Sequence, residues 1–338
     1  MTRKVRYAVV GLGHIAQVAV LPAFAHAREN SELAALVSGD PVKRETLARR
    51  YGVPRACGYD EYEDCLRAGD IDAVYIALPN SMHREYAERA ADAGVHVLCE
   101  KPMAVTEDEC EAMIRAARRN GVRLMIAYRL HFEQANLEAI EIVRSGRIGE
   151  PRLFNATFTM HVADGNIRLE RRMGGGTLYD IGIYCINAAR NLFRDEPIEV
   201  QAACAGRRGD VEEAASCVLR FPGERLAAFT CSFGAGKVST CQVVGTRGDL
   251  RLDPAFEYAG TLRHRLSVGE HVEERAFDKR DQFAPELVHF SECVLAGREP
   301  EPSGAEGLAD VRLIRALYES ARTGRPVKPE PVERVRRP

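Results

Sequence analysis

The most informative stretch at the start of the chain is Val5-Arg6-Tyr7-Ala8-Val9-Val10-Gly11-Leu12-Gly13-His14-Ile15-Ala16. Its first half is β-rich, and residues 17–27 continue with helical spacing. A strand that leads through G-x-G-x-x-A into a helix is the context of a dinucleotide-binding turn, although an ordinary tight turn gives the same pattern. Gly11 would allow the turn, and Gly13 would let the backbone approach a pyrophosphate. The helix start at His14 and Ile15 would supply free N–H groups.

The second predicted strand, residues 32–37, ends at Ser38-Gly39-Asp40 and is followed by Lys43 and Arg44. In an NAD-selective site, an acidic residue at this strand end holds the ribose hydroxyls and repels a 2′-phosphate. Ser38 and Gly39 occupy that place here, and Lys43 and Arg44 could neutralise a phosphate bound by Ser38. The pattern therefore favours NADP over NAD. Two alternatives stay open: Asp40 could still reach a ribose, and both cations could be solvated residues of a surface helix.

A buried-strand run at residues 71–78 leads into Pro79-Asn80-Ser81-Met82-His83. Ser81 is predicted to cap a helix that runs to residue 93, and Gly94 to end it. Ligands bind at the carboxyl edge of parallel strands, so this turn is a candidate for cofactor contacts. The candidates are Leu78, Pro79, Asn80 and His83. Taken alone, His83 is more often a satisfied histidine in a first helical turn.

The next strand, residues 95–99, runs into Glu100-Lys101-Pro102. Thr106 and Glu109 form a capping-box pattern that predicts a helix to residue 120, and residues 122–127 form one more strand. The alternation of β and α elements predicts an α/β domain over residues 1–127, a Rossmann-type, doubly wound parallel sheet. Lys101 stands at the mouth of a strand, where a lysine by itself is most simply a solvated cation.

The pattern changes after Tyr128. A helix at residues 133–145 is followed by residues 153–162, where apolar and polar side chains alternate as in a half-buried strand. We expect an α+β domain over residues 128–338, with a large, mostly antiparallel open sheet and helices on one face. The C-terminal helix is a candidate to pack back on the first domain. The other face of the sheet needs cover, which predicts a homodimer or homotetramer. The further predicted elements are helices at residues 177–192, 285–295 and 304–322, strands at residues 200–204, 217–221, 226–233, 240–244 and 250–252, and a hairpin turn at residues 245–249.

Gly174-Gly175-Gly176 opens the most informative stretch of the second half. Three glycines let the backbone approach something closely, and the following helix places Asp180 and Tyr184 at i and i+4 on one face, with Asn187 able to share it. An acid and a phenol on one face could form a proton relay. The alternative is structural, with Thr177 and Asp180 as a capping-box variant and Tyr184 in the core.

Composition narrows the class of protein. A chain of 338 residues is expected to form two domains. Lysine plus arginine (47) nearly balances aspartate plus glutamate (49), so the basic footprint of a nucleic-acid-binding protein is lacking. The ten cysteines are scattered and show no metal-ligand spacing, which indicates free thiols in a reducing compartment and no metal. The chain has no signal-peptide pattern and no run of 18 apolar residues. We therefore expect a cytoplasmic protein with no membrane or nucleic-acid partner.

Together the motifs resemble the Gfo/Idh/MocA oxidoreductase family. The resemblance rests on Gly11-Leu12-Gly13, residues 79–83, Glu100-Lys101-Pro102 and residues 174–184, and it covers nearly the full length. Within the family, residues 180–184 and the tail at residues 310–327 are similar to the glucose–fructose oxidoreductase branch. Many other members carry His at the position of Tyr184. The family implies a Rossmann domain, an α/β domain whose sheet mediates oligomerisation, and hydride transfer between a nicotinamide and a sugar or cyclitol carbon.

The same resemblance implies the site. Lys101, Asp180 and Tyr184 would be the catalytic set. Cofactor contacts would come from Gly11, Gly13, His14, Ile15, Ser38, Gly39, Lys43, Arg44, Leu78, Pro79, Asn80, His83, Glu100, Lys101 and Tyr128, and substrate contacts from Lys101, Arg129, His131, Asp180 and Tyr184. The chain departs from the glucose–fructose branch at Phe132 and Gln134, where Tyr and Pro are usual, so the identity of the sugar stays open.

The chemistry is consistent with this set. Oxidising a secondary alcohol removes its proton while hydride leaves for the nicotinamide, and a phenol, which ordinarily ionises near pH 10, is a poor base unless a cation favours phenolate. We expect Lys101 to supply that cation and Asp180 to hold the lysine or a substrate hydroxyl. The sequence thus predicts an NADP(H)-dependent oxidoreductase acting on a sugar hydroxyl or carbonyl. The alternatives are another polyol, keto-sugar or dihydrodiol dehydrogenase of the family, and a non-catalytic NADP-binding regulator.

Overall fold

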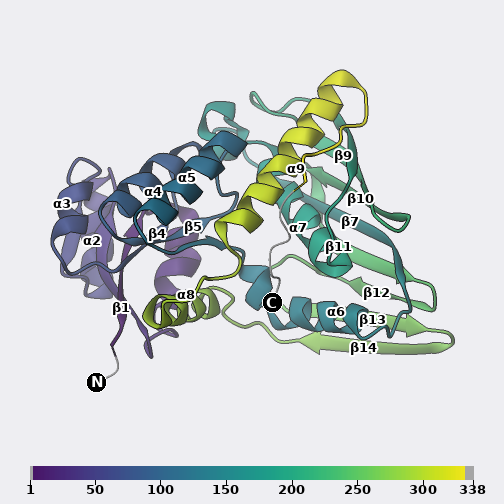
Figure 1. Ribbon diagram of the computed structural model, residues 1–338, viewed down its shortest axis with the longest axis horizontal. Coiled ribbons are helices and arrows are strands. Elements are labelled where there is room, and N and C mark those ends of the chain that lie inside the picture. Colours follow the sequence, from purple (N-terminus) through teal and green to yellow (C-terminus); the bar gives the residue numbers. More distant parts are fainter. Residues whose placement is uncertain (1–2, 332–338) are drawn as a thin grey trace. The chain divides into compact units, whose positions relative to one another are not determined.

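The computed structural model describes residues 3–331, which divide into two compact units. The first unit contains the residues up to Arg129 together with Asp281–Leu308, and the second contains Leu130–Arg280 and the residues from Ala309 onward. Figure 1 labels the elements of both. The division differs from a single border after residue 127, because the chain returns to the first unit with α8 (Ala284–Ala296).

The first unit is built on a six-stranded parallel sheet in the order β3-β2-β1-β4-β5-β6. This confirms the doubly wound α/β sheet expected from the sequence. The strand order reverses between β1 and β4, so the ends of these two strands form the switch point at which such sheets bind ligands. The strands are β1 (Val5–Val10), β2 (Ser31–Val37), β3 (Arg55–Cys57), β4 (Ala73–Ile76), β5 (His96–Glu100) and β6 (Leu124–Ala127).

The helices between these strands begin and end where local chemistry directs them. Thr106 and Glu109 form the predicted capping box, and Gly94 and Gly121 take the left-handed conformation just beyond their helices. The prediction for Ser81 was wrong: it lies inside the 3-10 turn Asn80–Met82, and α4 begins at His83. The helix expected at residues 17–27 is shorter, a π-helical turn (Ala16–Val20) that continues as α1. The α-helices are α1 (Leu21–Ala23), α2 (Pro41–Tyr51), α3 (Tyr62–Arg67), α4 (His83–Asp92) and α5 (Glu107–Arg119).

Helix α8 is tied to the first sheet by buried polar contacts. The hydroxyl of Tyr7 on β1 lies 2.7 Å from Ser291 Oγ and donates to the carbonyl of Leu287 at 3.3 Å. Ser31 on β2 lies 2.7 Å from the same Ser291 hydroxyl. Apolar periodicity predicts such a helix but does not say which sheet it covers, and this explains why the sequence left α8 with the second domain.

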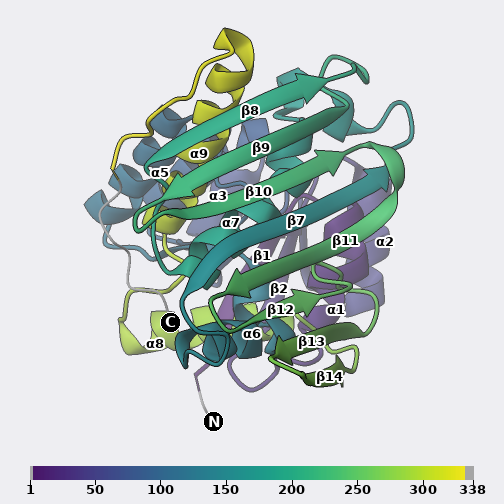
Figure 2. The same cartoon turned by 90° about the vertical axis from the view of Figure 1, so that its right-hand side faces the viewer.

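The second unit is built on an eight-stranded sheet in the order β14-β13-β12-β11-β7-β10-β9-β8. Strands β7 and β10 pair in parallel and the other neighbours pair antiparallel, which confirms the mostly antiparallel sheet. Figure 2 shows this sheet with α6 and α7 behind it. The strands are β7 (Pro151–His161), β8 (Glu199–Ala205), β9 (Ala214–Phe221), β10 (Arg225–Ser232), β11 (Gly234–Gly245), β12 (Gly248–Leu252), β13 (Leu262–Val268) and β14 (His271–Phe277).

Three helices accompany this sheet: α6 (Gln134–Arg144), α7 (Ile183–Phe193) and α9 (Gly304–Thr323), whose first residues belong to the first unit. A π-helical turn, Leu178–Gly182, precedes α7 where a continuous helix was predicted. The hairpin β13–β14 was not predicted. Strand β14 is exposed along almost its whole length, so its sequence lacks the alternation that marks a half-buried strand.

Across residues 3–331, none of the helices is both long enough and apolar enough to span a lipid bilayer.

Candidate active site

The glycine-rich turn after β1 has two different steric roles. Gly11 takes a left-handed φ of 91°, and an added Cβ would lie 2.6 Å from the carbonyl oxygen of Ala77, so the close approach of the β1 and β4 exits requires glycine. At Gly13, no described atom lies within 4 Å of an added Cβ. The Cα of Gly13 therefore faces open space just before a helical segment, as a phosphate-binding turn requires. His14 and Ile15 follow it directly in the sequence.

The end of β2 brings Ser38 and Arg44 together. Arg44 donates from Nη1 to the carbonyl of Ser38 at 3.2 Å, and Gly39 packs so close to Tyr59 that a Cβ would lie 3.0 Å from its ring. Asp40 is the N-cap of α2, because its carboxylate accepts from the backbone N–H of Lys43 at 3.0 Å. That hydrogen bond and the Lys43 ammonium hold the pKa of Asp40 below its usual range. Asp40 thus has a structural task, which weakens the alternative that it holds a ribose.

His83, a predicted cofactor contact, clamps two loops. It is fully buried, with Nδ1 2.9 Å from the carbonyl oxygen of Pro102 and Nε2 2.9 Å from that of Leu78. Burial lowers the pKa of His83, while the two carbonyls oppose that change. The ring therefore joins the turn after β4 to the Lys101-Pro102 turn, and this is the structural interpretation that the sequence had also allowed.

Lys101 follows β5 directly and is half-buried. The carboxylate of Glu100 accepts from the backbone N–H of Lys101 at 3.2 Å and from the Tyr75 hydroxyl at 2.9 Å. Burial raises the pKa of Glu100, and the charge of Lys101 and the Tyr75 hydrogen bond partly offset that rise. These contacts fix the backbone from which the lysine side chain starts.

A second buried carboxyl group, that of Glu286 on α8, interacts electrostatically with Glu100. Glu286 is 0% exposed, and within residues 3–331 neither of its carboxyl oxygens has a hydrogen-bond partner. Burial, and then the charge of Glu100, raise the pKa of Glu286 well above its usual range, and Arg129 partly opposes this. Sequence reasoning missed this group, because an acid in the first turn of a helix ordinarily faces solvent.

Replacing Glu286 by Met is expected to stabilise the protein, and more so at higher pH. The folded state keeps a proton on Glu286 above the pH at which the unfolded chain loses it, so the stability of the wild type falls as pH rises from about 5 towards 8. Leaving a buried polar group unsatisfied costs about 1–3 kcal/mol, so we expect a gain of that size, or several degrees in Tm. Thermal unfolding at both pH values measures it.

The exposed Glu292 on the same helix provides the control. Glu292→Met should change Tm little and without a pH trend. A Glu286→Met variant that is no more stable than wild type near pH 8 would contradict the assignment of a protonated, unsatisfied carboxyl group.

Tyr128 and Arg129 follow β6 and are both buried. Arg129 donates to Oε1 of Gln282 at 2.5 Å, and its charge partly opposes the rise in the pKa values of Glu100 and Glu286. Arg129, a predicted substrate contact, therefore also balances the two buried acids of the first unit.

In the second unit, Asp180 is paired with an arginine that the sequence did not single out. Arg168 donates from Nε to Oδ2 of Asp180 at 2.8 Å, and the charge of Asp180 raises the pKa of Arg168, to which Tyr184 also contributes. The three groups thus lie close enough to interact. Gly175 explains how Arg168 reaches them, because a Cβ there would lie 2.4 Å from the Arg168 carbonyl oxygen. What the glycine run approaches closely is thus the backbone of this chain itself, at Arg168.

The ring of Tyr184 packs on two phenylalanines, with its centroid 5.6 Å from that of Phe158 on β7 and 6.1 Å from that of Phe256. The aromatic cluster holds the ring while the side chain stays partly exposed. The ring of Tyr184 therefore packs in the aromatic cluster, as the core interpretation predicted, but the residue is not fully buried.

The structural alternative for this stretch, a capping-box variant at Thr177 and Asp180, is not formed. The N-terminus of this helix is capped by Glu212, whose Oε1 accepts from the N–H groups of Thr177 at 2.7 Å and Leu178 at 3.3 Å. The Thr177 hydroxyl donates to the Glu212 carbonyl at 2.8 Å instead. Glu212, which lies in a loop distant in sequence, thus caps the helix in place of Thr177. The carboxylate of Asp180 pairs with Arg168 instead.

His131, a predicted substrate contact, begins a buried polar chain in the second unit. Its Nε2 lies 2.7 Å from Oδ1 of Asn187 and 2.9 Å from Nδ2 of Asn191. Asn187 donates from Nδ2 to Oδ2 of Asp310 at 2.8 Å, and Arg190 donates to Oδ1 of Asp310 at 2.6 Å. Asn187 had been placed beside Asp180 and Tyr184 from helical spacing, whereas its partners are His131, Asn191 and Asp310.

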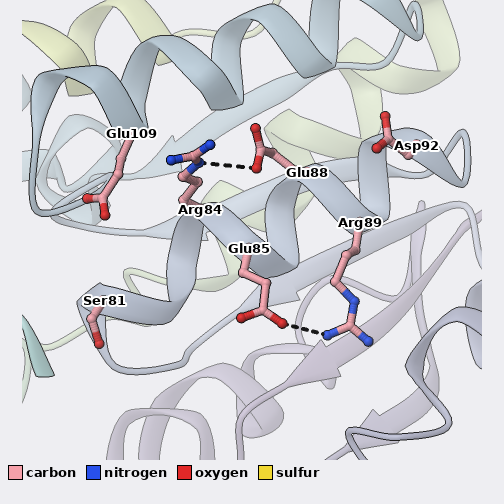
Figure 3. A pocket seen from close by; sticks show the side chains of 7 residues that line it. All are labelled: Ser81, Arg84, Glu85, Glu88, Arg89, Asp92 and Glu109. Atoms are coloured by element: carbon pink, nitrogen blue, oxygen red, sulfur yellow. Dashed lines mark hydrogen bonds and ion pairs between the residues drawn. The ribbon is translucent and has the colours of Figure 1, made fainter.

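A charged groove lies beside α4 of the first unit (Figure 3). Its side chains pair among themselves, with Arg84 to Glu88 at 3.2 Å and Arg89 to Glu85 at 3.0 Å. None of the predicted site residues lines it. We assign it no part in the chemistry.

The glycine turn lies at the switch point of a parallel sheet, and Lys101 follows β5, the next strand but one from β1 across the sheet. This arrangement is typical of a dinucleotide-dependent enzyme of the Rossmann class. Comparison with protein families makes this specific. Residues 5–128 match the oxidoreductase family model with an NAD-binding Rossmann fold, and residues 136–251 match the GFO/IDH/MocA C-terminal domain. The chain belongs to the GFO/IDH/MocA family.

Several relatives cover almost the whole chain. A D-xylose 1-dehydrogenase [NADP(+)] of Haloarcula marismortui is 34% identical over 330 residues, 94% of this chain and 91% of its own. The structure of an aldose-aldose oxidoreductase from Caulobacter crescentus superimposes with a TM-score of 0.92 at 42% identity and covers 96% of this chain and 100% of its own. A 3-ketoreductase from Actinomadura kijaniata, solved with NADP and TDP-benzene, has a TM-score of 0.87 at 28% identity, covering 94% and 98%.

Proposed function

We propose that this protein is an NADP(H)-dependent oxidoreductase that transfers hydride between the nicotinamide and a hydroxyl or carbonyl carbon of a sugar. The observation that carries the proposal is full-length similarity to enzymes of this kind, among them the NADP(+)-dependent D-xylose dehydrogenase and the aldose-aldose oxidoreductase. The first unit would bind the cofactor. The second would bind the sugar and contribute to assembly.

The turns after β1 and β2 fit NADP. Open space at Gly13 suits a pyrophosphate, and Ser38 with Arg44 offers a hydroxyl and a guanidinium where an NAD-selective site would carry an acid. The Asp40 carboxylate is held by the N-terminus of α2. When bound, NADP(H) would accept or supply the hydride, and the side chains of the protein would handle the proton.

Lys101, Asp180 and Tyr184 are the residues that we assign to catalysis, and the proton chemistry falls to Tyr184 and Lys101. Tyr184 would act as general acid and base on the sugar oxygen, and Lys101 would favour the phenolate. Asp180 is paired with Arg168, so we assign it the orientation of a sugar hydroxyl rather than proton transfer. Arg168 joins the proposed site as a residue that holds Asp180 in place.

The Arg44→Met variant tests the cofactor assignment. It keeps an apolar stem and removes the guanidinium, so we expect the Kd for NADPH to rise about 10- to 100-fold, as for a lost charge-assisted hydrogen bond, and the Kd for NADH to stay within about twofold. Arg49→Met, near the other end of α2, is the matched control and should change neither value. Equal weakening of both cofactors by Arg44→Met would count against a 2′-phosphate site at Ser38.

The function itself is tested by following NADPH absorbance with a panel of aldoses, ketoses, polyols and lactones. Turnover with a sugar is the expected result, and the panel also identifies a polyol or dihydrodiol dehydrogenase. Tight NADPH binding without turnover on any member would favour a regulator that keeps the fold, and would overturn the proposed activity.

We propose further that the protein is a cytoplasmic homodimer or homotetramer assembled through the eight-stranded sheet. Strands of this sheet carry exposed apolar side chains, at Leu153, Val218, Leu226, Val238 and Val272. All ten cysteines are free thiols and nine of them are buried, which suits a reducing compartment. Sedimentation measures the oligomeric state.

A further inference from the structure

The eight-stranded sheet of the second unit has two edge strands, β14 and β8, which differ in chemistry (Figure 2). An edge strand presents N–H and C=O groups that can pair with another chain, and charged side chains on the strand oppose such pairing. Strand β14 carries Glu273, Glu274 and Arg275. Strand β8 carries one charge, at its first residue Glu199, and residues 200–205 are uncharged. The edge of β8 therefore needs protection of another kind.

The segment after α9 covers this edge. Gly324 takes a left-handed φ of 69° directly after the helix, which turns the chain. Val327 then forms an antiparallel bridge with Val200 of β8. The Val200 N–H donates to the Val327 carbonyl at 2.8 Å, and the Val327 N–H donates to the Val200 carbonyl at 2.9 Å. Both backbone groups that Val200 presents at the edge are thus paired within the same chain.

Ser320 of α9 covers the next N–H group along the edge. Alternate residues of a strand face away from its neighbour, so Ala202 follows Val200 on the outer side of β8. The Ala202 N–H donates to Oγ of Ser320 at 3.1 Å, and the Ser320 hydroxyl donates to the carbonyl of Arg325 at 2.7 Å. Ser320 is 0% exposed. This serine therefore ties the edge of β8 to the segment that forms the bridge.

The composition of the covering segment ends the sheet rather than extending it. Pro326, Pro329 and Pro331 have no backbone N–H group, and Lys328 between them is an exposed charge. Prolines and lysines are the residues that discourage the pairing of a further strand. Arg312 of α9 holds the end of the segment by donating to the carbonyl of Pro331 at 3.2 Å.

We propose that residues 324–331 are an edge cover, which keeps β8 from pairing with β8 of a second copy of this chain. The excluded partner is a second copy because two identical uncharged strands related by a twofold axis can pair antiparallel, each supplying the same backbone groups. This surface differs from the face of the sheet, through which we propose the normal assembly. The inference is independent of the enzymatic activity.

Val327→Pro in the full chain tests the cover. Proline removes the N–H group that binds the Val200 carbonyl and places a ring carbon against it, so the bridge should open. At low protein concentration we expect hydrogen exchange of the Val200 amide to become about tenfold faster, as for one lost hydrogen bond, with little change in Tm. Lys328→Pro is the matched control, because the N–H next to a bridge residue points away from the partner strand.

Ser320→Ala is a second variant, which removes one hydroxyl group and leaves the Val327 backbone as it is. It should speed exchange of the Ala202 amide about tenfold, for the same reason. Wild-type exchange at Val200 in Val327→Pro, or at Ala202 in Ser320→Ala, would mean that these contacts do not protect the edge, and would overturn the proposal.

Sedimentation velocity under reducing conditions tests what the open edge does. We expect Val327→Pro to form species larger than those of wild type, in amounts that grow with protein concentration. Adding Cys204→Lys to Val327→Pro should abolish them, because Cys204 is exposed on β8 and a lysine there places like charges on both edges. Sedimentation that stays like wild type in Val327→Pro, or association that persists with Cys204→Lys, overturns the proposal.

Discussion

Replacing Lys101 by Met is expected to lower turnover by at least about 100-fold and to leave the Kd for NADPH within about threefold of wild type. The substitution keeps most of the length of the side chain and removes its charge, so a phenolate would lose its stabilising cation. The backbone of Lys101 is held by the Glu100 carboxylate and by the His83 clamp on Pro102, and neither contact needs the ammonium group. Steady-state kinetics and NADPH fluorescence titration separate the two effects.

Lys279→Met is the matched control, since Lys279 is an exposed lysine in a loop of the second unit. It should show wild-type turnover and affinity. Near-normal turnover in Lys101→Met would sink the assignment of Lys101 to catalysis, and loss of NADPH binding would instead place Lys101 in cofactor recognition.

Replacing Tyr184 by Phe is expected to lower turnover by about 100- to 10,000-fold, the range for loss of a general acid or base, with little change in Tm. The ring should still pack on Phe158 and Phe256, because the substitution removes only the hydroxyl group. Steady-state kinetics, together with thermal unfolding, measure both.

Tyr258→Phe is the control for a half-buried phenol of the same unit, and should leave turnover within about twofold. A Tyr184→Phe variant that keeps its rate would show that another group moves the proton. Packing in the aromatic cluster would then be the only role of Tyr184.

The elements that the sequence predicted best are those whose signals are local. Thr106 and Glu109 satisfy each other within one turn, and the glycine pattern that begins at Gly11 directly follows its strand, although the steric demand on Gly11 comes from Ala77 after β4. Thr177 and Asp180 have the same spacing of a threonine and an acid, yet Glu212 caps that helix from a loop 35 residues away. A capping pattern in the sequence identifies a candidate cap residue. Which residue caps the helix depends on whether the fold brings another acid to the same backbone N–H groups.

The candidate site shows the same division. The glycine turn and the Ser38 strand end were predictable, because they depend on residues next to one another in sequence. The partners of the site residues were not predictable from the sequence. Arg168 binds Asp180 after the chain has passed close to itself at Gly175, and Asp310 binds Asn187, which lies 123 residues away in sequence. Glu286 gave no signal, since a buried acid without a partner looks in sequence like any exposed acid of a helix.

The path of the chain limits how this protein can be divided. Among the described residues, the chain passes between the two units after Arg129, after Arg280 and after Leu308. The family model of the dinucleotide-binding domain ends at residue 128, but a fragment cut there would lack α8, and with it the Ser291 hydroxyl that meets Tyr7 and Ser31. The cofactor-binding half is therefore not a continuous cassette. A chimaera that exchanges it between relatives has to carry residues 281–308 along with the N-terminal segment.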